Sequence, residues 1–128
     1  MRPRRAVLVL ALFAAGCGQA LPAAPPPHPG TIAGIVLSAP TCPVERIGSP
    51  CPPRPVPGAQ VEVFAADGGR RARASADPDG RFRVTVPAGR YRVTATNTGA
   101  LRTSAEAQVS VASGATATVR LVVDSGIR

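Results

Sequence analysis

Residues 77–95 read Asp-Pro-Asp-Gly-Arg-Phe-Arg-Val-Thr-Val-Pro-Ala-Gly-Arg-Tyr-Arg-Val-Thr-Ala, and this stretch decides the fold. On both sides of Pro-Ala-Gly, apolar residues alternate with polar ones, the period of two that a half-buried β-strand requires. Proline presets φ for a turn, and glycine accepts a positive φ. The stretch therefore predicts two strands joined by a hairpin at residues 87–89, with a further hairpin at residues 77–80 before them.

The same pattern continues along the chain, and no segment shows helical periodicity. Further turns are predicted where Pro57-Gly58 begins a strand and at a hairpin over residues 112–115. Seven predicted strands within about 94 residues indicate a β-sandwich. They lie near Thr31–Leu37, Ala59–Ala65, Arg71–Ala76, Arg81–Val86, Tyr91–Asn97, Ala105–Val111 and Thr116–Val123. Alternation predicts a buried set of Ile32, Val36, Val61, Val63, Phe82, Val84, Val86, Tyr91, Val93, Ala95, Val109, Val111, Val119, Leu121 and Val123.

The N-terminus has the composition of an export signal. Three arginines precede the apolar run Ala6–Ala15, which at about 1.5 Å per residue spans roughly half a bilayer core. Residues 1–16 are therefore predicted to be a signal peptide that is removed. Ala14-Ala15-Gly16-Cys17 resembles the lipobox of bacterial lipoproteins, which implies that Cys17 receives a diacylglyceryl group and becomes the mature N-terminus. Ordinary secretion with cleavage nearby is the alternative.

Residues 17–30 contain a proline-rich stretch, Leu-Pro-Ala-Ala-Pro-Pro-Pro-His-Pro-Gly. Such a composition favours extended polyproline II and predicts a tether that holds the domain about 30 Å from the lipid. The membrane, through this lipid anchor, is thus a predicted partner. Without residues 1–16, 12 arginines face 7 acidic residues, a net charge of +5. Export, and the lack of dense basic clusters interleaved with aromatics, argue against nucleic acid as a partner.

Two further cysteines, Cys42 and Cys51, lie in a proline-rich segment over residues 40–55. Outside the cytoplasm an even pair of cysteines predicts a disulfide, which we expect to pin this segment against the sandwich. A metal site would need three or four ligands, and the only histidine, His28, lies in the predicted tether. We therefore expect neither a metal nor another cofactor.

Four motifs follow one another in a familiar order: Gly-Ile-Val at 34–36, Pro-Gly-Ala-Gln-Val at 57–61, Asp-Pro-Asp-Gly-Arg-Phe at 77–82 and Pro-Ala-Gly-Arg-Tyr at 87–91. This series resembles the carboxypeptidase regulatory-like domain. The resemblance implies an antiparallel, seven-stranded, Greek-key sandwich of the transthyretin (prealbumin) type over residues 31–124, with residues 40–55 as an insertion. It also implies a non-catalytic module, because the family's members are appended to metallocarboxypeptidases, outer-membrane receptors and surface proteins.

The transthyretin-like fold includes one group of enzymes, the hydroxyisourate hydrolases. Those enzymes use several histidines and a C-terminal Tyr-Arg-Gly-Ser, whereas this sequence has one histidine and ends Asp-Ser-Gly-Ile-Arg. Serine nucleophiles also lack a base in the predicted folded region. We therefore expect a structural or interaction module on the extracytoplasmic side of the cell membrane rather than an enzyme.

Arginine is the one residue type that could form a binding surface. Outward positions on three successive predicted strands carry arginine, and a basic stripe results if those strands are neighbours. Such a stripe would attract an acidic polymer or an acidic protein at the cell surface, and a soluble secreted binding protein is the alternative function. A merely solvated face that blocks aggregation is the other interpretation. The arginines are Arg71, Arg73, Arg81, Arg83, Arg90 and Arg92.

Overall fold

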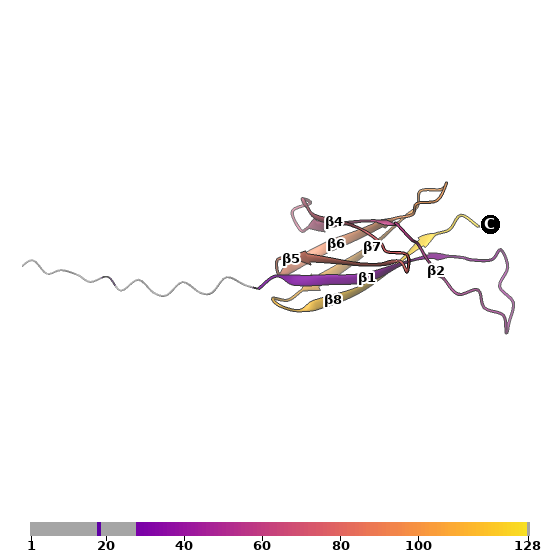
Figure 1. Ribbon diagram of the computed structural model, residues 1–128, viewed down its shortest axis with the longest axis horizontal. Helices are drawn as coiled ribbons and strands as arrows, with labels where there is room; N and C mark the ends of the chain where they lie inside the picture. The colour runs from indigo at the N-terminus through magenta and orange to yellow at the C-terminus, as the bar shows by residue number, and fades with distance from the viewer. Residues whose placement is uncertain (1–17, 19–27, 128) are drawn as a thin grey trace, which may run out of the picture.

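The computed structural model describes residue 18 and residues 28–127, and these form two packed β-sheets (Figure 1). Seven strands correspond to those predicted, and β2 is an additional strand of two residues. The strands are β1 (Gly30–Ala39), β2 (Arg54–Pro55), β3 (Gln60–Ala65), β4 (Arg70–Ser75), β5 (Arg81–Val86), β6 (Gly89–Thr96), β7 (Ser104–Val111) and β8 (Thr116–Asp124).

Strand β1 is the centre of the first sheet, and it pairs with β8 along one side and with β5 and then β2 along the other. The second sheet has the order β4-β3-β6-β7. All pairs are antiparallel except β1 and β8, which run parallel. Strand β6 returns beside β3 after the chain has visited the other sheet, as in a Greek key. The predicted all-β sandwich is confirmed, with the parallel β1–β8 pair as an exception to its antiparallel order.

The three turns predicted as hairpins instead carry the chain from one sheet to the other. At residues 77–80 the turn forms as its residues predict, because the Asp77 N–H donates to the Arg81 carbonyl at 2.8 Å. The strands on either side nevertheless pair elsewhere, β4 with β3 and β5 with β1. Residues 87–88 and 112–115 likewise connect strands of different sheets. The turn residues fix a local reversal of the chain, but the choice of neighbour depends on which sheet buries each apolar face.

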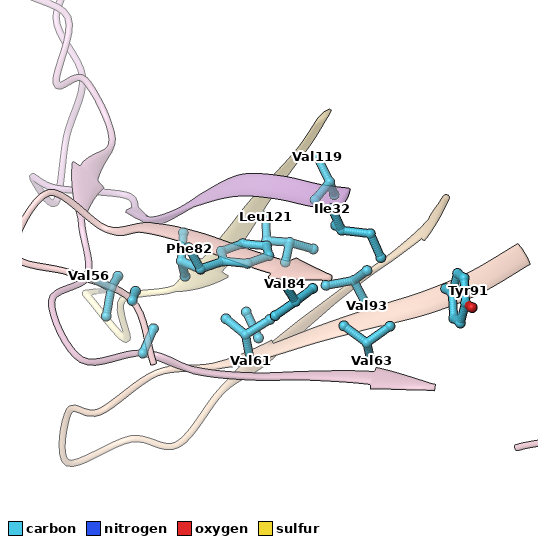
Figure 2. Packing of buried hydrophobic residues seen from close by; sticks show 14 of the residues in the cluster. Ile32, Val56, Val61, Val63, Phe82, Val84, Tyr91, Val93, Val119 and Leu121 are labelled. Atoms are coloured by element: carbon cyan, nitrogen blue, oxygen red, sulfur yellow. The ribbon is translucent and has the colours of Figure 1, made fainter. Parts of the chain in front are cut away.

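The core between the sheets is almost entirely aliphatic (Figure 2). Fourteen of the fifteen residues predicted to be buried are buried, and none of the described polar or charged residues is. Val109 is the exception, because it lies on the edge strand β7 and is only partly buried. The largest side chains that are fully buried are Ile32, Leu121, Val36, Val61, Val63, Val86, Val93 and Val123.

Gly34 brings β1 and β5 together at the first sheet's inner face. A Cβ atom at this position would lie 2.6 Å from the Phe82 ring and 2.6 Å from the Val119 carbonyl oxygen. The glycine of the Gly-Ile-Val motif therefore makes room for Phe82, whose ring packs inward from the neighbouring strand.

The disulfide predicted between Cys42 and Cys51 is present, with the Cα atoms 6.0 Å apart. The loop that it closes extends beyond the end of the sandwich opposite to the start of β1 (Figure 1). Its base is attached, since Ser125 donates a hydrogen bond to the Pro40 carbonyl, but Ile47 at its tip is fully exposed. The disulfide thus closes the loop on itself, and the expectation that it would pin the whole segment to the sandwich is corrected.

Candidate functional site

The six predicted arginines do not lie on one face. Strands β4 and β6 belong to the same sheet but are separated by β3, and β5 belongs to the other sheet. The expected single stripe is absent because the turns before and after β5 cross between the sheets. Arg71, Arg73, Arg90 and Arg92 lie on the β4-β3-β6-β7 sheet, and Arg81 and Arg83 lie on β5.

On the β4-β3-β6-β7 sheet, arginines are mixed with carboxylates. Arg92 lies 3.8 Å from Glu106 (Nε to Oε2), and its guanidinium carbon is 4.9 Å from the centroid of the Phe64 ring. Arg70, which pairs with Phe64 from the other side, lies 3.5 Å from Glu62. These side chains are between a third and about half exposed, so each ion pair contributes little to stability. Their effect is to neutralise part of this face's positive charge.

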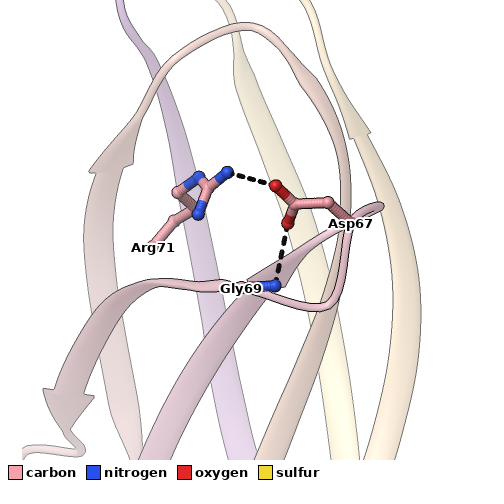
Figure 3. A network of polar contacts seen from close by, with 3 residues as sticks. All are labelled: Asp67, Gly69 and Arg71. Carbon is pink, nitrogen blue, oxygen red and sulfur yellow. Dashed lines mark hydrogen bonds and ion pairs between the residues drawn. The ribbon is translucent and has the colours of Figure 1, made fainter.

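The β3–β4 turn holds a tighter pair (Figure 3). Asp67 Oδ2 accepts a hydrogen bond from Arg71 at 2.7 Å, and Asp67 Oδ1 accepts one from the Gly69 backbone N–H at 2.8 Å. The Gly69 N–H first, and the Arg71 guanidinium after it, hold the pKa of the Asp67 carboxyl below its ordinary value of 3.8. Arg71 is therefore already occupied by a carboxylate of its own turn.

The outer face of the other sheet has a different composition. Because Ile32, Val84 and Val119 are buried, their neighbours along each strand point outward. Strand pairing sets these outward residues in three rows across β5, β1 and β8, and we call the nine residues the arginine–threonine face. The rows are Thr85, Thr31 and Thr116; Arg83, Ala33 and Thr118; and Arg81, Ile35 and Arg120.

No carboxylate belongs to the arginine–threonine face, and within the described residues none of its arginines has an ion pair. Arg81 and Arg120 flank Ile35, with a shallow hollow of about 440 Å³ above it. Asp77, which lines a second hollow with Arg81 and Arg83, accepts the backbone N–H groups of Asp79 and Arg81, both at 2.9 Å, and has no ion pair among the described residues. Over residues 28–127, three arginines without an ion pair therefore share this face, against two, Arg73 and Arg90, on the β4-β3-β6-β7 sheet, and anion binding there stays a prediction.

Arg120 is absent from the predicted set although the sequence contained the signal for it. Val119 and Leu121 were expected to be buried, so alternation already placed Arg120 outward. What the sequence could not supply was the parallel pairing of β8 with β1, which brings Arg120 beside Ile35 and into one row with Arg81.

Residues 28–127 show no group of three or more His, Cys, Asp or Glu side chains that could hold a metal ion. His28 is exposed, and its carbonyl oxygen accepts a hydrogen bond from the Ser113 hydroxyl at 2.9 Å. Over the described part of the chain, no helix is long and apolar enough to cross a membrane. Cys17, the signal peptide and most of the predicted tether lie outside the described residues.

Several solved structures share this fold at low sequence identity. The minor pilin GBS52 of Streptococcus agalactiae has a TM-score of 0.55 and 13% identity over 77% of this chain and 45% of its own. The Bacillus anthracis TIE protein has a TM-score of 0.55 and 17% identity over 76% of this chain and 16% of its own. A DUF3823 family protein of Parabacteroides merdae has a TM-score of 0.51 and 15% identity over 76% and 46%.

This chain spans less than half of each of those proteins, so the likeness shows the fold alone. No curated protein matches the sequence. The sequence profile of the carboxypeptidase regulatory-like domain matches residues 50–123, more than half of the chain. That range includes three of the four motifs quoted above and every strand from β2 to β8 apart from the last residue of β8. The chain therefore belongs to the carboxypeptidase regulatory-like domain family.

Proposed function

We propose that this protein is a non-enzymatic interaction module outside the cytoplasm, anchored to the membrane by a lipid on Cys17. The observation that carries the proposal is the contrast between the interior and the surface of the described residues. The interior is apolar: no described carboxylate or histidine is buried, and the hydroxyl of the buried Tyr91 donates a hydrogen bond to the Pro87 carbonyl, whereas one face presents three unpaired arginines. The disulfide supports an oxidising location.

The arrangement of the two ends suits a tethered module. The first described strand begins at the end of the sandwich opposite to the disulfide-closed loop (Figure 1). A module anchored through residues 17–30 would present that loop farthest from the membrane, with both sheet faces open to partners. The minor pilin and the TIE protein named above are similar in fold, and they are compatible with a surface role without specifying one.

Metabolic labelling with an alkyne fatty acid tests the lipid anchor. The natural chain should take up the label and sediment with membranes, and Cys17→Ser should lose both properties. The double variant Cys42→Ser/Cys51→Ser is the matched control, because it removes two thiols but leaves the lipobox intact, and it should remain labelled. Mass spectrometry showing an unmodified mature N-terminus at any other residue would refute the anchor.

A second candidate function is a soluble secreted protein that binds an acidic ligand. The arginine–threonine face favours it, since none of the three arginines on that face has an ion pair within the described residues. Retention on a heparin column at low salt tests this function, and the labelling experiment separates it from the lipid-anchored module.

A further inference from the structure

The β8 strand has one side without a hydrogen-bonding neighbour. Among the described strands it pairs only with β1, over nine residues from Thr116 to Asp124. An unpaired strand edge offers a row of N–H and C=O groups to another extended chain.

Two hydrogen bonds at the ends of the ladder show which backbone groups of β8 point toward β1 and which point away from it. The Thr31 N–H donates to the Ala115 carbonyl at 2.9 Å, and the Ser125 N–H donates to the Ala39 carbonyl at 3.0 Å. Successive residues of a strand direct their backbone groups to opposite sides, so odd-numbered residues of β8 face β1. The even-numbered ones, Thr116, Thr118, Arg120 and Val122, direct their N–H and C=O groups to the open edge.

This edge is accessible over most of its length. All four residues are exposed, and no backbone bond outside the ladder involves them. The edge is closed only at its far end, where the Asp124 carbonyl accepts hydrogen bonds from Asn97 at 3.3 Å and Thr103 at 2.6 Å. Seven residues, from Thr116 to Val122, are thus open to a further strand.

The open edge lacks the usual features that prevent pairing. Strand β4, at one edge of the other sheet, has a bulge and three arginines, whereas the open segment of β8 has neither a bulge nor a proline and one charge, Arg120. Strand β7 is also a long edge, but its only charged residue is Glu106, which would repel an acidic strand.

We propose that β8 accepts an extended, acidic segment of another protein as an additional strand of the first sheet. The side chains of such a strand that point outward would lie beside Arg120, continuing the row that contains Arg81 and Ile35. A carboxylate there would complement Arg120, the one charge of the open segment, whereas Arg81 lies two strands away on β5. A second copy of this chain fits less well, because its open segment Thr116–Val122 brings no carboxylate: antiparallel overlap of the two segments sets Arg120 opposite Thr118 and diagonal to the second copy's Arg120. The inference gives the proposed interaction module its contact surface and rests on that module being an interaction protein.

The probe is the seven-residue peptide acetyl-Glu-Val-Glu-Val-Glu-Val-Glu-amide, which matches the length of the open edge. On the protein as exported by the cell, saturating peptide should slow hydrogen exchange of the Thr116, Thr118, Arg120 and Val122 amides about ten-fold or more. The same peptide with N-methyl groups on alternate amides keeps its charge but cannot pair, and it should bind about ten-fold more weakly. Equal affinity of the two peptides would overturn strand addition and leave only charge attraction.

Variants of the protein make the test specific. Thr118→Pro removes an N–H that points away from β1, so it should keep the fold but weaken peptide binding about ten-fold. Thr118→Val changes the same side chain, keeps the N–H and should bind like the natural chain. Arg120→Glu should weaken binding to a similar extent as Thr118→Pro, whereas Arg90→Glu, an equal change of charge on the other sheet, should not.

Two outcomes would refute the proposed occupant. If the protein without peptide forms dimers in sedimentation and the same four amides are already protected, a second copy occupies the edge. If Thr118→Pro binds the peptide as tightly as Thr118→Val while both stay folded by circular dichroism, the edge is not used. Neither outcome depends on Cys17, so the lipid anchor stands or falls by the labelling experiment alone.

Discussion

The two outer faces of this sandwich both carry arginines but differ in what surrounds them. On the β4-β3-β6-β7 sheet, Arg92 and Arg70 have carboxylate partners, and Arg92 also lies over an aromatic ring. On the β5-β1-β8 sheet, Arg81, Arg83 and Arg120 surround alanine, isoleucine and threonines. The comparison teaches that the position of the carboxylates, rather than the number of arginines, decides which face offers free positive charge.

The largest loss of stability is expected from the core beneath the arginine–threonine face. Leu121 is fully buried on the inner side of β8, and Leu121→Ala should lower the free energy of unfolding by about 2–5 kcal/mol. Val122 is the next residue on the same strand but points outward and is 43% exposed. Val122→Ala should cost less than about 1 kcal/mol. Denaturant unfolding measures both, and equal losses would mean that β8 does not face the core as described.

The second prediction separates the faces by charge. Arg81→Glu with Arg120→Glu should abolish retention on heparin at about 20 mM salt, where the Debye length is roughly 20 Å. Arg73→Glu with Arg90→Glu makes the same change of net charge on the other sheet and should leave most of the retention. The melting temperatures of both variants should stay within a few degrees of the natural chain's value, because all four side chains are exposed.

Two results would break the comparison of the faces. If both double variants lose retention equally, net charge rather than the arginine–threonine face binds heparin. If the natural chain shows no retention at that salt concentration, the unpaired arginines form only a solvated face.

Much of this fold follows from the sequence, because alternation is a local property of each strand. Residues 81–86 and 91–97 could be recognised as strands, and their buried residues named, without knowledge of their neighbours. Strand pairing is not local. The Asp-Pro-Asp-Gly turn reverses the chain whether the next strand joins the same sheet or the opposite one. The sequence of the turn therefore does not distinguish a hairpin from the connection between two sheets that residues 77–80 make.

Strand pairing also decides which arginines lie on the same surface. A single basic stripe requires successive strands to be neighbours, which would set Arg71, Arg83 and Arg92 on one surface, whereas the structure divides them between two. Arg120 belongs with Arg81 through a parallel pair between the first and last strands, a contact across 85 residues of chain. The disulfide, in contrast, required only compartment and cysteine count, and it was predicted correctly.

A third prediction concerns the carboxylates of the β4-β3-β6-β7 sheet, whose removal should make its charge more like that of the arginine–threonine face. Glu62→Gln with Glu106→Gln removes the partners of Arg70 and Arg92 without adding bulk. Because exposed ion pairs are worth little, the free energy of unfolding should fall by less than about 1 kcal/mol per pair. Retention on heparin should nevertheless increase, because the positive potential around Arg70 and Arg92 is no longer reduced by a neighbouring carboxylate. Glu45→Gln, in the disulfide-closed loop, is a control for net charge. If the double variant increases retention by no more than twice the increase seen for Glu45→Gln, the change of net charge explains it, and the ion pairs of Arg70 and Arg92 do not.

The smallest expected effect concerns the Asp67 turn. The folded state holds the pKa of Asp67 below the ordinary value of 3.8, first through the Gly69 N–H and then through Arg71. A depressed folded pKa means that the carboxylate stabilises the fold at every pH above the unfolded value, and that this stabilisation is lost as pH falls through the folded pKa. Asp67→Asn should therefore be slightly less stable than the natural chain at pH 7 and equally stable well below pH 3.8.

Paired denaturation curves at pH 7 and in acid measure this difference. Asp79→Asn is the matched control, because Asp79 is an exposed turn residue whose carboxylate has no hydrogen bond or ion pair to residues 28–127. Its effect on stability should not follow the same pH dependence. Adding salt at pH 7 should reduce the Asp67→Asn difference only in part, because the Gly69 N–H is a direct hydrogen bond and only the Arg71 pairing is open to screening. If Asp67→Asn is less stable than the natural chain by the same amount in acid as at pH 7, the amide disturbs the turn itself, and the charge of the Asp67 carboxylate is not the cause of the difference.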